Sequence, residues 1–217
     1  MAIFELKQEL SVAQGILAQL RDPDIQLDRF RFRHNLQRLG QLLAYELSKS
    51  LTYVSFPLQT GLGQAKVADL EQQPVLVCVM RAGLPFYQGF SDMFEQADSG
   101  FIGAYRQELT PSGTQDIFLG YSATPDIAGR DVILIDPMLA TGSSLVKVWR
   151  LLEQQGAVRS LHIAAAIAAP EGVRFIQQQL GEDVNLWIGA IDDHLNADDY
   201  IVPGLGDAGD LSFGDKR

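Results

Sequence analysis

The feature that most constrains the fold is a series of short apolar runs separated by segments with helical spacing. The runs are Pro74–Met80, Asp131–Ile135, Ser160–Ala169 and Asn185–Ile191, and they are rich in valine, isoleucine and alanine. Continuous apolar runs of this length are typical of strands that are buried on both faces. Residues 82–94, 144–156 and 171–180 lie between them and show the apolar periodicity of helices. We therefore predict an α/β fold, an open and mostly parallel sheet with helices on both faces.

Two further strands are predicted at Ser99–Arg106 and Asp116–Ser122, and a helix at Pro23–Leu51. The apolar stripe of this helix is formed by Leu27, Phe30, Leu36, Leu39, Leu43 and Leu47. The basic residues among them, Arg29, Arg31, Arg33, Arg38 and Lys49, form either a solvated face or a partner surface. The residues between this helix and Pro74 are expected to form a loop. One domain over 1–217 is predicted: a helical segment at about 1–51, a sheet core at about 74–190, a C-terminal loop at 191–217, and a small hood made from the two chain ends.

The charge and the cysteine count exclude some classes of function. The formal net charge is −10, whereas a protein that binds the nucleic-acid backbone needs a basic surface. A small phosphorylated ligand remains compatible, because a few local arginines can bind it. The single cysteine, Cys78, lies in an apolar run and is predicted to be a buried side chain. Since one cysteine forms no internal disulfide, and since neither a secretory leader nor an apolar run of roughly 18 residues is visible, we expect a cytoplasmic protein without a membrane partner.

The stretch Asp131–Val148 predicts an anion site. A buried strand ends at Asp136, a tight loop of small residues follows, and a helix begins directly after it. Ligands of open parallel sheets bind outside the carboxyl ends of strands, and the free N–H groups of a helix N-terminus favour an anion. The hydroxyls of Thr141, Ser143 and Ser144 can add donors, although serine and threonine at this position are also ordinary helix caps. The loop lacks the lysine of the triphosphate-binding P-loop, so a phosphomonoester is the better fit.

A second glycine-rich stretch, Gly204–Gly209, has the spacing G-x-G-x-x-G. A dinucleotide fingerprint must follow a strand and open a helix within a βαβ unit. The chain after Gly209 is short and broken by glycine, so we expect a loop with another purpose.

These stretches resemble the type I phosphoribosyltransferases, and specifically the uracil phosphoribosyltransferase family. The segments that carry the resemblance, in the order of the family, are Met80–Leu84, Ala104–Glu108, Ile133–Ser144, Ala168–Val173, Ile191–Asn196 and Tyr200–Asp210. The similarity covers about Val75–Gly214, and the first seventy residues carry only a loose likeness. The resemblance implies an enzyme of pyrimidine salvage that joins uracil N1 to C1 of 5-phosphoribosyl 1-diphosphate, producing UMP and diphosphate.

The resemblance also implies roles for individual residues. The catalytic positions are Asp136, Arg106 and Asp207. The sugar-diphosphate positions are Arg81, Arg106, Asp136, Pro137, Met138, Leu139, Ala140, Thr141, Gly142, Ser143, Ser144 and Asp207. The uracil positions are Ile201, Gly206, Asp207 and Ala208. Mg²⁺ is the expected cofactor, bound mainly by ligand and water and near Asp136 or Asp207. The expected partners are uracil, the sugar diphosphate and further copies of the chain in a homodimer or larger oligomer.

The chain departs from the family at three places. Ser143 replaces a second glycine of the phosphate loop, Ala123 occupies the place of a lysine, and the basic residue that commonly follows Asp210 is absent. Two alternatives therefore stay open beside the uracil enzyme. One is a non-catalytic nucleotide-binding regulator with the same fold, and the other is an enzyme for another base. His194 lies near the base-binding stretch and is kept as a candidate for a local role, whereas His162, inside an apolar run, is expected to be structural.

Overall fold

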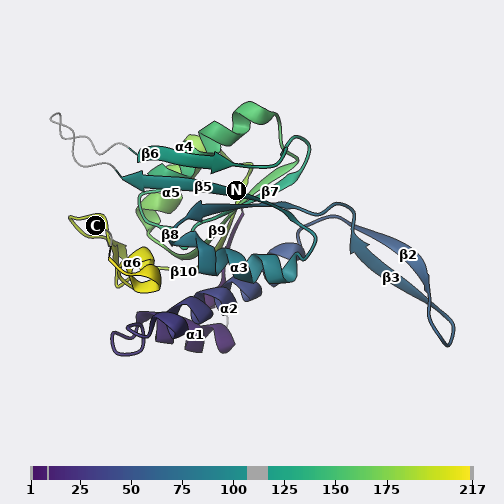
Figure 1. Ribbon diagram of the computed structural model, residues 1–217, viewed down its shortest axis with the longest axis horizontal. Helices are drawn as coiled ribbons and strands as arrows, with labels where there is room; N and C mark the ends of the chain where they lie inside the picture. Colours follow the sequence, from purple (N-terminus) through teal and green to yellow (C-terminus); the bar gives the residue numbers. More distant parts are fainter. Residues whose placement is uncertain (1, 9, 107–116, 216–217) are drawn as a thin grey trace.

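A central, mostly parallel sheet organises the molecule (Figure 1). The computed structural model describes residues 2–8, 10–106 and 117–215. The strands of the sheet run in the order β1-β10-β9-β7-β4-β5-β6. Neighbouring strands are parallel except for β6, which is antiparallel to β5. Their bounds are β1 Ile3–Glu5, β4 Val75–Met80, β5 Asp98–Arg106, β6 Ile117–Ala123, β7 Asp131–Ile135, β9 Ser160–Ala168 and β10 Val184–Ile191.

Helices cover both faces of the sheet, as the sequence predicts (Figure 1). One face carries α1 Val12–Arg21, α2 Arg29–Ser48 and α3 Gly83–Met93. The other carries α4 Ser143–Leu152 and α5 Pro170–Leu180. A short 3-10 turn, Leu6–Gln8, follows β1, and a second, Glu153–Gln155, prolongs α4 as far as its C-cap, Gly156.

The strands feed two apolar cores because successive side chains of a strand point to opposite faces. In β7, Ile133 and Ile135 pack with the helices of the first face, whereas Val132 and Leu134 pack with α4 and α5. All four side chains are fully buried. Cys78 of β4 is buried as predicted, and burial raises the pKa of its thiol well above the usual range.

The predicted helix at Pro23–Leu51 is wrong in its first part. The chain instead forms α1, turns at residues 22–28 and begins α2 at Arg29. Asp28 caps α2 by accepting from the N–H groups of Phe30 and Arg31. Leu27 precedes the helix and is exposed, Phe30 in its first turn is also exposed, and Phe32 occupies the buried stripe instead.

Residues 53–70 were expected to form a loop, and they form a hairpin instead. Its strands, β2 Tyr53–Gln59 and β3 Gln64–Leu70, pair antiparallel and project away from the central sheet (Figure 1). Every residue of β2 is exposed, including the apolar side chains of Tyr53, Val54, Phe56 and Leu58.

The C-terminal segment and the N-terminal helices form the predicted hood. The segment contains β11 His194–Leu195, β12 Ile201–Val202 and the short helix α6 Ala208–Phe213. In Figure 1, α6 lies beside α2 and next to the sheet. Arg33 of α2 donates to the carbonyl of Ser212 at 2.7 Å and ties the two chain ends together. In the described ranges, no helix combines the length and apolar character needed to cross a membrane.

A polar network closes the amino end of the sheet. The Trp187 indole N–H donates to Nδ1 of His162 at 3.1 Å, so the other ring nitrogen, Nε2, carries the proton and faces the Ser160 hydroxyl at 2.8 Å. Ser160 in turn donates to Asp131 at 2.6 Å, and Arg159 also donates to Asp131. His162 is therefore part of the structural framework, as the sequence predicts.

Candidate active site

A cavity of about 920 Å³ opens at the carboxyl ends of the central strands. Four segments far apart in the sequence line it: the end of β4 with the turn into α3, the middle of β5, the loop from β7 to α4, and the C-terminal segment. The lining residues are Val79, Met80, Arg81, Ala82, Leu84, Gly103, Ala104, Asp136, Met138, Ala140, Ser144, Asp198, Asp199, Tyr200, Ile201, Gly206, Asp207, Ala208, Gly209 and Asp215. This is the edge at which open parallel sheets bind ligands.

The loop from β7 to α4 is held in shape by its backbone. Its short strand β8, Met138–Leu139, pairs with β9, and the Pro137 carbonyl accepts from two β9 residues, Ala166 and Ile167. Gly142 precedes α4 with φ +80, and a Cβ at this position would lie 3.1 Å from the carbonyl oxygen of Gly172. A glycine is therefore required where the loop turns into the helix.

Hydroxyl groups surround the first turn of α4. The Thr141 hydroxyl accepts from the N–H of Ser143 at 3.3 Å and donates to its Oγ at 3.1 Å. Ser144 lines the cavity. The Ser144 side chain and the positive end of the α4 dipole therefore lie beside the same space, which suits a phosphate group.

Asp136 follows β7 directly and faces the cavity. Its carboxylate accepts from the backbone N–H of Met138 at 3.1 Å. Burial raises the pKa of this carboxyl to about 7, and the Met138 hydrogen bond opposes that shift. Asp136 therefore has acceptor capacity directed at whatever occupies the cavity.

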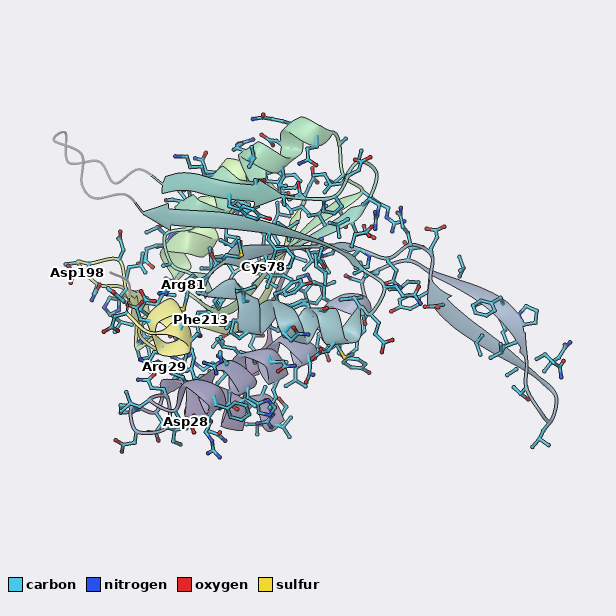
Figure 2. The ribbon with its side chains drawn as sticks, viewed as in Figure 1. Asp28, Arg29, Cys78, Arg81, Asp198 and Phe213 are labelled. Atoms are coloured by element: carbon cyan, nitrogen blue, oxygen red, sulfur yellow. The ribbon has the colours of Figure 1, made fainter. Side chains whose placement is uncertain are left out.

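Arg81 enters the cavity from the turn after β4. Its Nη2 donates to a carboxylate oxygen of Asp210 at 2.9 Å and to the Gly214 carbonyl at 3.1 Å. Figure 2 shows Arg81 between the sheet and α6, the helix that carries Phe213. The Arg81 side chain is 39% exposed. It can therefore exchange an internal partner for a ligand oxyanion.

The C-terminal part of the cavity is a tight turn followed by α6. Ile201, Gly206 and Ala208 line the cavity together with Asp207. Asp207 caps α6 by accepting from the N–H groups of Gly209 and Asp210 at 2.8 and 3.0 Å. This stretch was expected to form a loop, but α6 begins within it, at Ala208. The strand before it, β12, pairs antiparallel with β11 in a separate small sheet, whereas a dinucleotide site belongs to a parallel βαβ unit.

The structure thus gathers most of the predicted site residues in one cavity. Arg81, Asp136, Met138, Ala140, Ser144, Ile201, Gly206, Asp207 and Ala208 all line it. Pro137, Leu139, Thr141, Gly142 and Ser143 lie in the loop behind the lining, and the side chain of Leu139 is fully buried in the core. The backbone of Arg106 ends β5, but its side chain lies outside the described part of the structure, as do residues 107–116.

Several cavity residues were missed by sequence reasoning. Met80 and Ala82 flank the predicted Arg81, and Tyr200 precedes the predicted Ile201. Asp198, labelled in Figure 2, lies on the loop between β11 and β12 and also lines the cavity. Asp210, the partner of Arg81, lies within the Tyr200–Asp210 stretch, and its charge at the end of a glycine-rich turn was the available signal.

The carboxylates of the cavity suit a hard divalent cation. Asp136, Asp198, Asp199, Asp207 and Asp215 all line it. Within residues 2–8, 10–106 and 117–215, however, no three acidic, histidine or cysteine side chains form a metal-binding group. This donor set fits Mg²⁺ bound through one or two carboxylates, with waters and phosphate oxygens as its other ligands.

Comparisons with known proteins agree with this geometry. The family model described as uracil phosphoribosyltransferase matches residues 8–215. A protein of that name from Porphyromonas gingivalis is 40% identical over 216 residues, covering 100% of both chains. Another, from Pyrococcus furiosus, is 34% identical over 203 residues, covering 92% of this chain and 85% of its own.

Solved structures extend the comparison to the fold. The AQ2163 protein from Aquifex aeolicus superposes with a TM-score of 0.85 at 31% identity, over 98% of each chain. A hypoxanthine phosphoribosyltransferase from Staphylococcus aureus superposes with a TM-score of 0.51 at 16% identity, over 75% of this chain and 76% of its own, and shares the fold alone.

Proposed function

The chain belongs to the uracil phosphoribosyltransferase family, and on this premise we propose how its residues carry out the reaction. The reaction joins N1 of uracil to C1 of 5-phosphoribosyl 1-diphosphate and releases diphosphate, which leaves UMP. The observation that carries the proposal is the convergence of Asp136, Arg81 and the 201–208 turn on one cavity. A carboxylate, a guanidinium and a glycine-rich backbone are the groups that a ribose, a diphosphate and a flat base each need.

The 5′-phosphate binds at the start of α4 in this proposal. The backbone N–H groups of the first helical turn point toward the loop, and the helix dipole favours an anion there. The hydroxyls of Thr141, Ser143 and Ser144 lie around this turn. Asp136, at the end of β7, then faces the ribose, and its carboxylate accepts hydrogen bonds from the sugar hydroxyls.

The leaving diphosphate binds Arg81, with Arg106 as the second predicted arginine. Arginine suits this role because its planar fork can donate to two phosphate oxygens at once. Asp210 and the Gly214 carbonyl accept from Arg81. Diphosphate binding would replace these acceptors by phosphate oxygens, which carry more negative charge.

Mg²⁺ is the proposed cofactor, and Asp136 and Asp207 are the carboxylates placed to hold it or its waters. When bound, the ion supplies positive charge that stabilises the departing diphosphate. The remaining catalysis comes from positioning and from electrostatic stabilisation of a positively charged sugar, for which no proton-transfer pair is needed.

Uracil binds against the turn from Ile201 to Ala208. The ring edge presents alternating acceptors and a donor, and main-chain N–H and C=O groups can present the complement. Gly206 lines the cavity with φ +88, and the absence of a side chain lets the backbone approach a flat ring.

One assay tests the activity and separates it from its alternatives. The purified protein is incubated with Mg²⁺, 5-phosphoribosyl 1-diphosphate and each of several bases, and diphosphate release is followed. Release with uracil and formation of UMP support the proposal. Release with another base would support a different phosphoribosyltransferase, and tight UMP binding without release would support a regulator.

We also propose that the protein associates with itself through the β2–β3 hairpin. The hairpin has two strands, and two strands alone are marginally stable in water. Strand β2 also exposes four large apolar side chains, each at 41–47%: Tyr53, Val54, Phe56 and Leu58. Exposed apolar side chains that lie together are typical of an interface, and in this proposal a second copy of the chain covers them. Light scattering should show an oligomer that Phe56→Glu dissociates, while the control Leu27→Glu, at an exposed site away from the hairpin, leaves it intact. A monomeric unmodified protein would contradict the proposal.

The cytoplasm is the proposed compartment. The chain has a single cysteine, and Cys78 is buried in the sheet rather than available for an intermolecular disulfide. Fractionation of cells that express the protein would test this placement.

A further inference from the structure

We infer that Arg21 and Asp192 form a positioning pair that holds the uracil-binding turn in shape. The inference rests on the proposed function, because it assigns the pair to the base-binding end of the same cavity. Neither residue lines the cavity, so the pair would act through the turn and not by contact with substrate.

Asp192 is a buried carboxylate at the end of a central strand. It follows β10, and its side chain is 0% exposed. Arg21, the last residue of α1, is its ionic partner, with 22% of the side chain exposed. Nη1 and Nη2 of Arg21 donate to the two carboxylate oxygens, each at 2.7 Å. This is the bidentate geometry in which an arginine–carboxylate pair is both strongest and most directional.

Both members of the pair also bind the backbone of Gly204. The N–H of Gly204 donates to Oδ2 of Asp192 at 2.9 Å, and Nη1 of Arg21 donates to the Gly204 carbonyl at 3.0 Å. The donor and the acceptor of one turn residue are therefore held by one ion pair. By contrast, the Arg150–Glu153 ion pair joins two exposed side chains three residues apart at the end of α4.

Gly204 is the tightest point of the turn that carries the uracil positions. Its φ is +61, and a Cβ here would lie 2.0 Å from the carbonyl oxygen of Ile201. Ile201 and Gly206, on either side of it, both line the cavity. A shift of Gly204 would therefore move the groups that face the base, and displacements of about 1 Å can cost about 100-fold in rate.

Stability alone is a weak reason for such a pair. Burying two charges costs desolvation energy, and apolar residues of similar size often stabilise a core equally well. The best-supported use of a buried ion pair is to specify one arrangement among several. Here the ion pair specifies the path of the turn. Besides binding each other, the Arg21 and Asp192 side chains each form a hydrogen bond with the backbone of Gly204.

Steady-state kinetics of Arg21→Gln and Asp192→Asn test the inference. Each variant removes one member of the ion pair while it keeps polar atoms near Gly204. We expect the KM for uracil to rise about tenfold or more, while the KM for the sugar diphosphate changes less than about twofold. Arg21→Lys keeps the charge but loses the fork, so it should recover part of the uracil affinity lost in Arg21→Gln.

Arg159→Gln is the matched control. Arg159 also binds a carboxylate with two donor atoms, on Asp131, but at the amino end of the sheet away from the cavity. This variant should lower the melting temperature without a change in the KM for uracil. If the Arg21 and Asp192 variants behaved in the same way, with lower stability and unchanged uracil KM, the pair would be merely structural and the inference would be overturned.

Two further outcomes are distinguishable. If the unmodified protein forms no UMP, the proposed function fails, whereas an active protein with insensitive variants contradicts the positioning role alone. If Arg21→Gln does not fold, hydrogen exchange in the unmodified protein replaces it. The amide of Gly204 should exchange far more slowly than that of Gly61 in the exposed hairpin turn. Equal exchange rates at the two glycines would contradict the proposal that Arg21 and Asp192 hold the turn.

Discussion

Strand β7 has an aspartate at each end, and the two carboxylates have opposite surroundings. Asp131, at the start, accepts hydrogen bonds from Arg159 and Ser160. Burial acts to raise its pKa, but these hydrogen bonds outweigh burial and hold the pKa below its ordinary value. Asp136, just after the strand, accepts from the Met138 N–H, and burial raises its pKa to about 7.

The comparison separates a carboxylate used for structure from one held for a ligand. At the amino end, side chains of the protein itself supply the partners that Asp131 needs. At the carboxyl end, Asp136 opens onto the cavity, where a ligand can supply them. Perturbed carboxyls of the second kind are the ones that gather at functional sites. Burial by itself does not leave a carboxylate available to a ligand. Asp192 is also buried, but Arg21 donates to both of its oxygens.

The largest expected effect comes from Asp136→Asn. The amide keeps an acceptor for the Met138 N–H, so the loop should fold, but the ribose hydroxyls lose a charged acceptor. We expect kcat/KM for UMP formation to fall by about 1000-fold, or about 4 kcal/mol of transition-state stabilisation. An unchanged rate would mean that the ribose binds elsewhere.

The same variant should not destabilise the ligand-free protein at pH 8. A carboxyl whose pKa is raised on folding stabilises the fold most at low pH, and that contribution is lost as the pH rises through about 7. The neutral amide escapes this loss, so thermal unfolding at pH 8 should occur at an equal or higher temperature.

Asp131→Ala should show the reverse pattern, with lower stability and intact catalysis. The substitution leaves Arg159 and Ser160 without their carboxylate partner at the amino end of the sheet. Because 32% of the Arg159 side chain is exposed, we expect a loss of about 3 kcal/mol, at the low end for a broken buried pair. Urea unfolding measures the loss, and kcat/KM should stay within about twofold of the unmodified value. A large loss of activity in the folded variant would contradict the distinction between a structural Asp131 and a ligand-binding Asp136.

Acid should destabilise the amino end through His162. Burial lowers the pKa of this histidine to about 4, and the nearby Asp131 carboxylate opposes the shift. Protonation would also place a second N–H against the Trp187 N–H. A histidine whose pKa is lowered on folding contributes full stability above pH 6.5 and loses it as the pH falls toward 4. Between pH 7 and pH 5, the free energy of unfolding should fall by about 2 kcal/mol more in the unmodified protein than in a His162→Gln variant. Parallel pH profiles for the two proteins would contradict this assignment.

Ser143→Gly should have the smallest effect. It restores the glycine that the family usually has in the phosphate loop, and it removes a hydroxyl that bonds to Thr141. Since Ser143 begins α4, the glycine should cost about 0.5–1 kcal/mol of stability, and the KM for the sugar diphosphate should change less than about threefold. A tenfold improvement would show that the serine Cβ crowds the site.

The parts of the fold predicted correctly are those in which local pattern and burial agree. The apolar runs of β4, β7, β9 and β10 became central strands, because strands covered on both faces need apolar side chains on both sides. The hairpin was missed for the opposite reason. Its apolar residues are exposed, and Ser55 and Pro57, which are typical of loops, lie between them.

The helix before the hairpin was misread for a different reason. Leu27 and Phe30 fit a helical stripe in the sequence, but the Asp28 cap turns them toward solvent. The two hydrogen bonds of the Asp28 cap mark the start of α2 six residues after the predicted start, and apolar periodicity alone does not detect a cap.

What the sequence by itself determined is the class of the fold and the chemistry of its loops. Apolar runs, small residues after Asp136 and the glycines near Gly204 are local features, and backbone sterics and burial act on them locally. Only the tertiary structure decided which distant groups meet. Arg21 binds Asp192 across 171 residues, and Arg81 binds Asp210 across 129. Such pairs depend on how the chain ends fold back over the sheet, and that path is set by the packing of the whole core rather than by any short stretch.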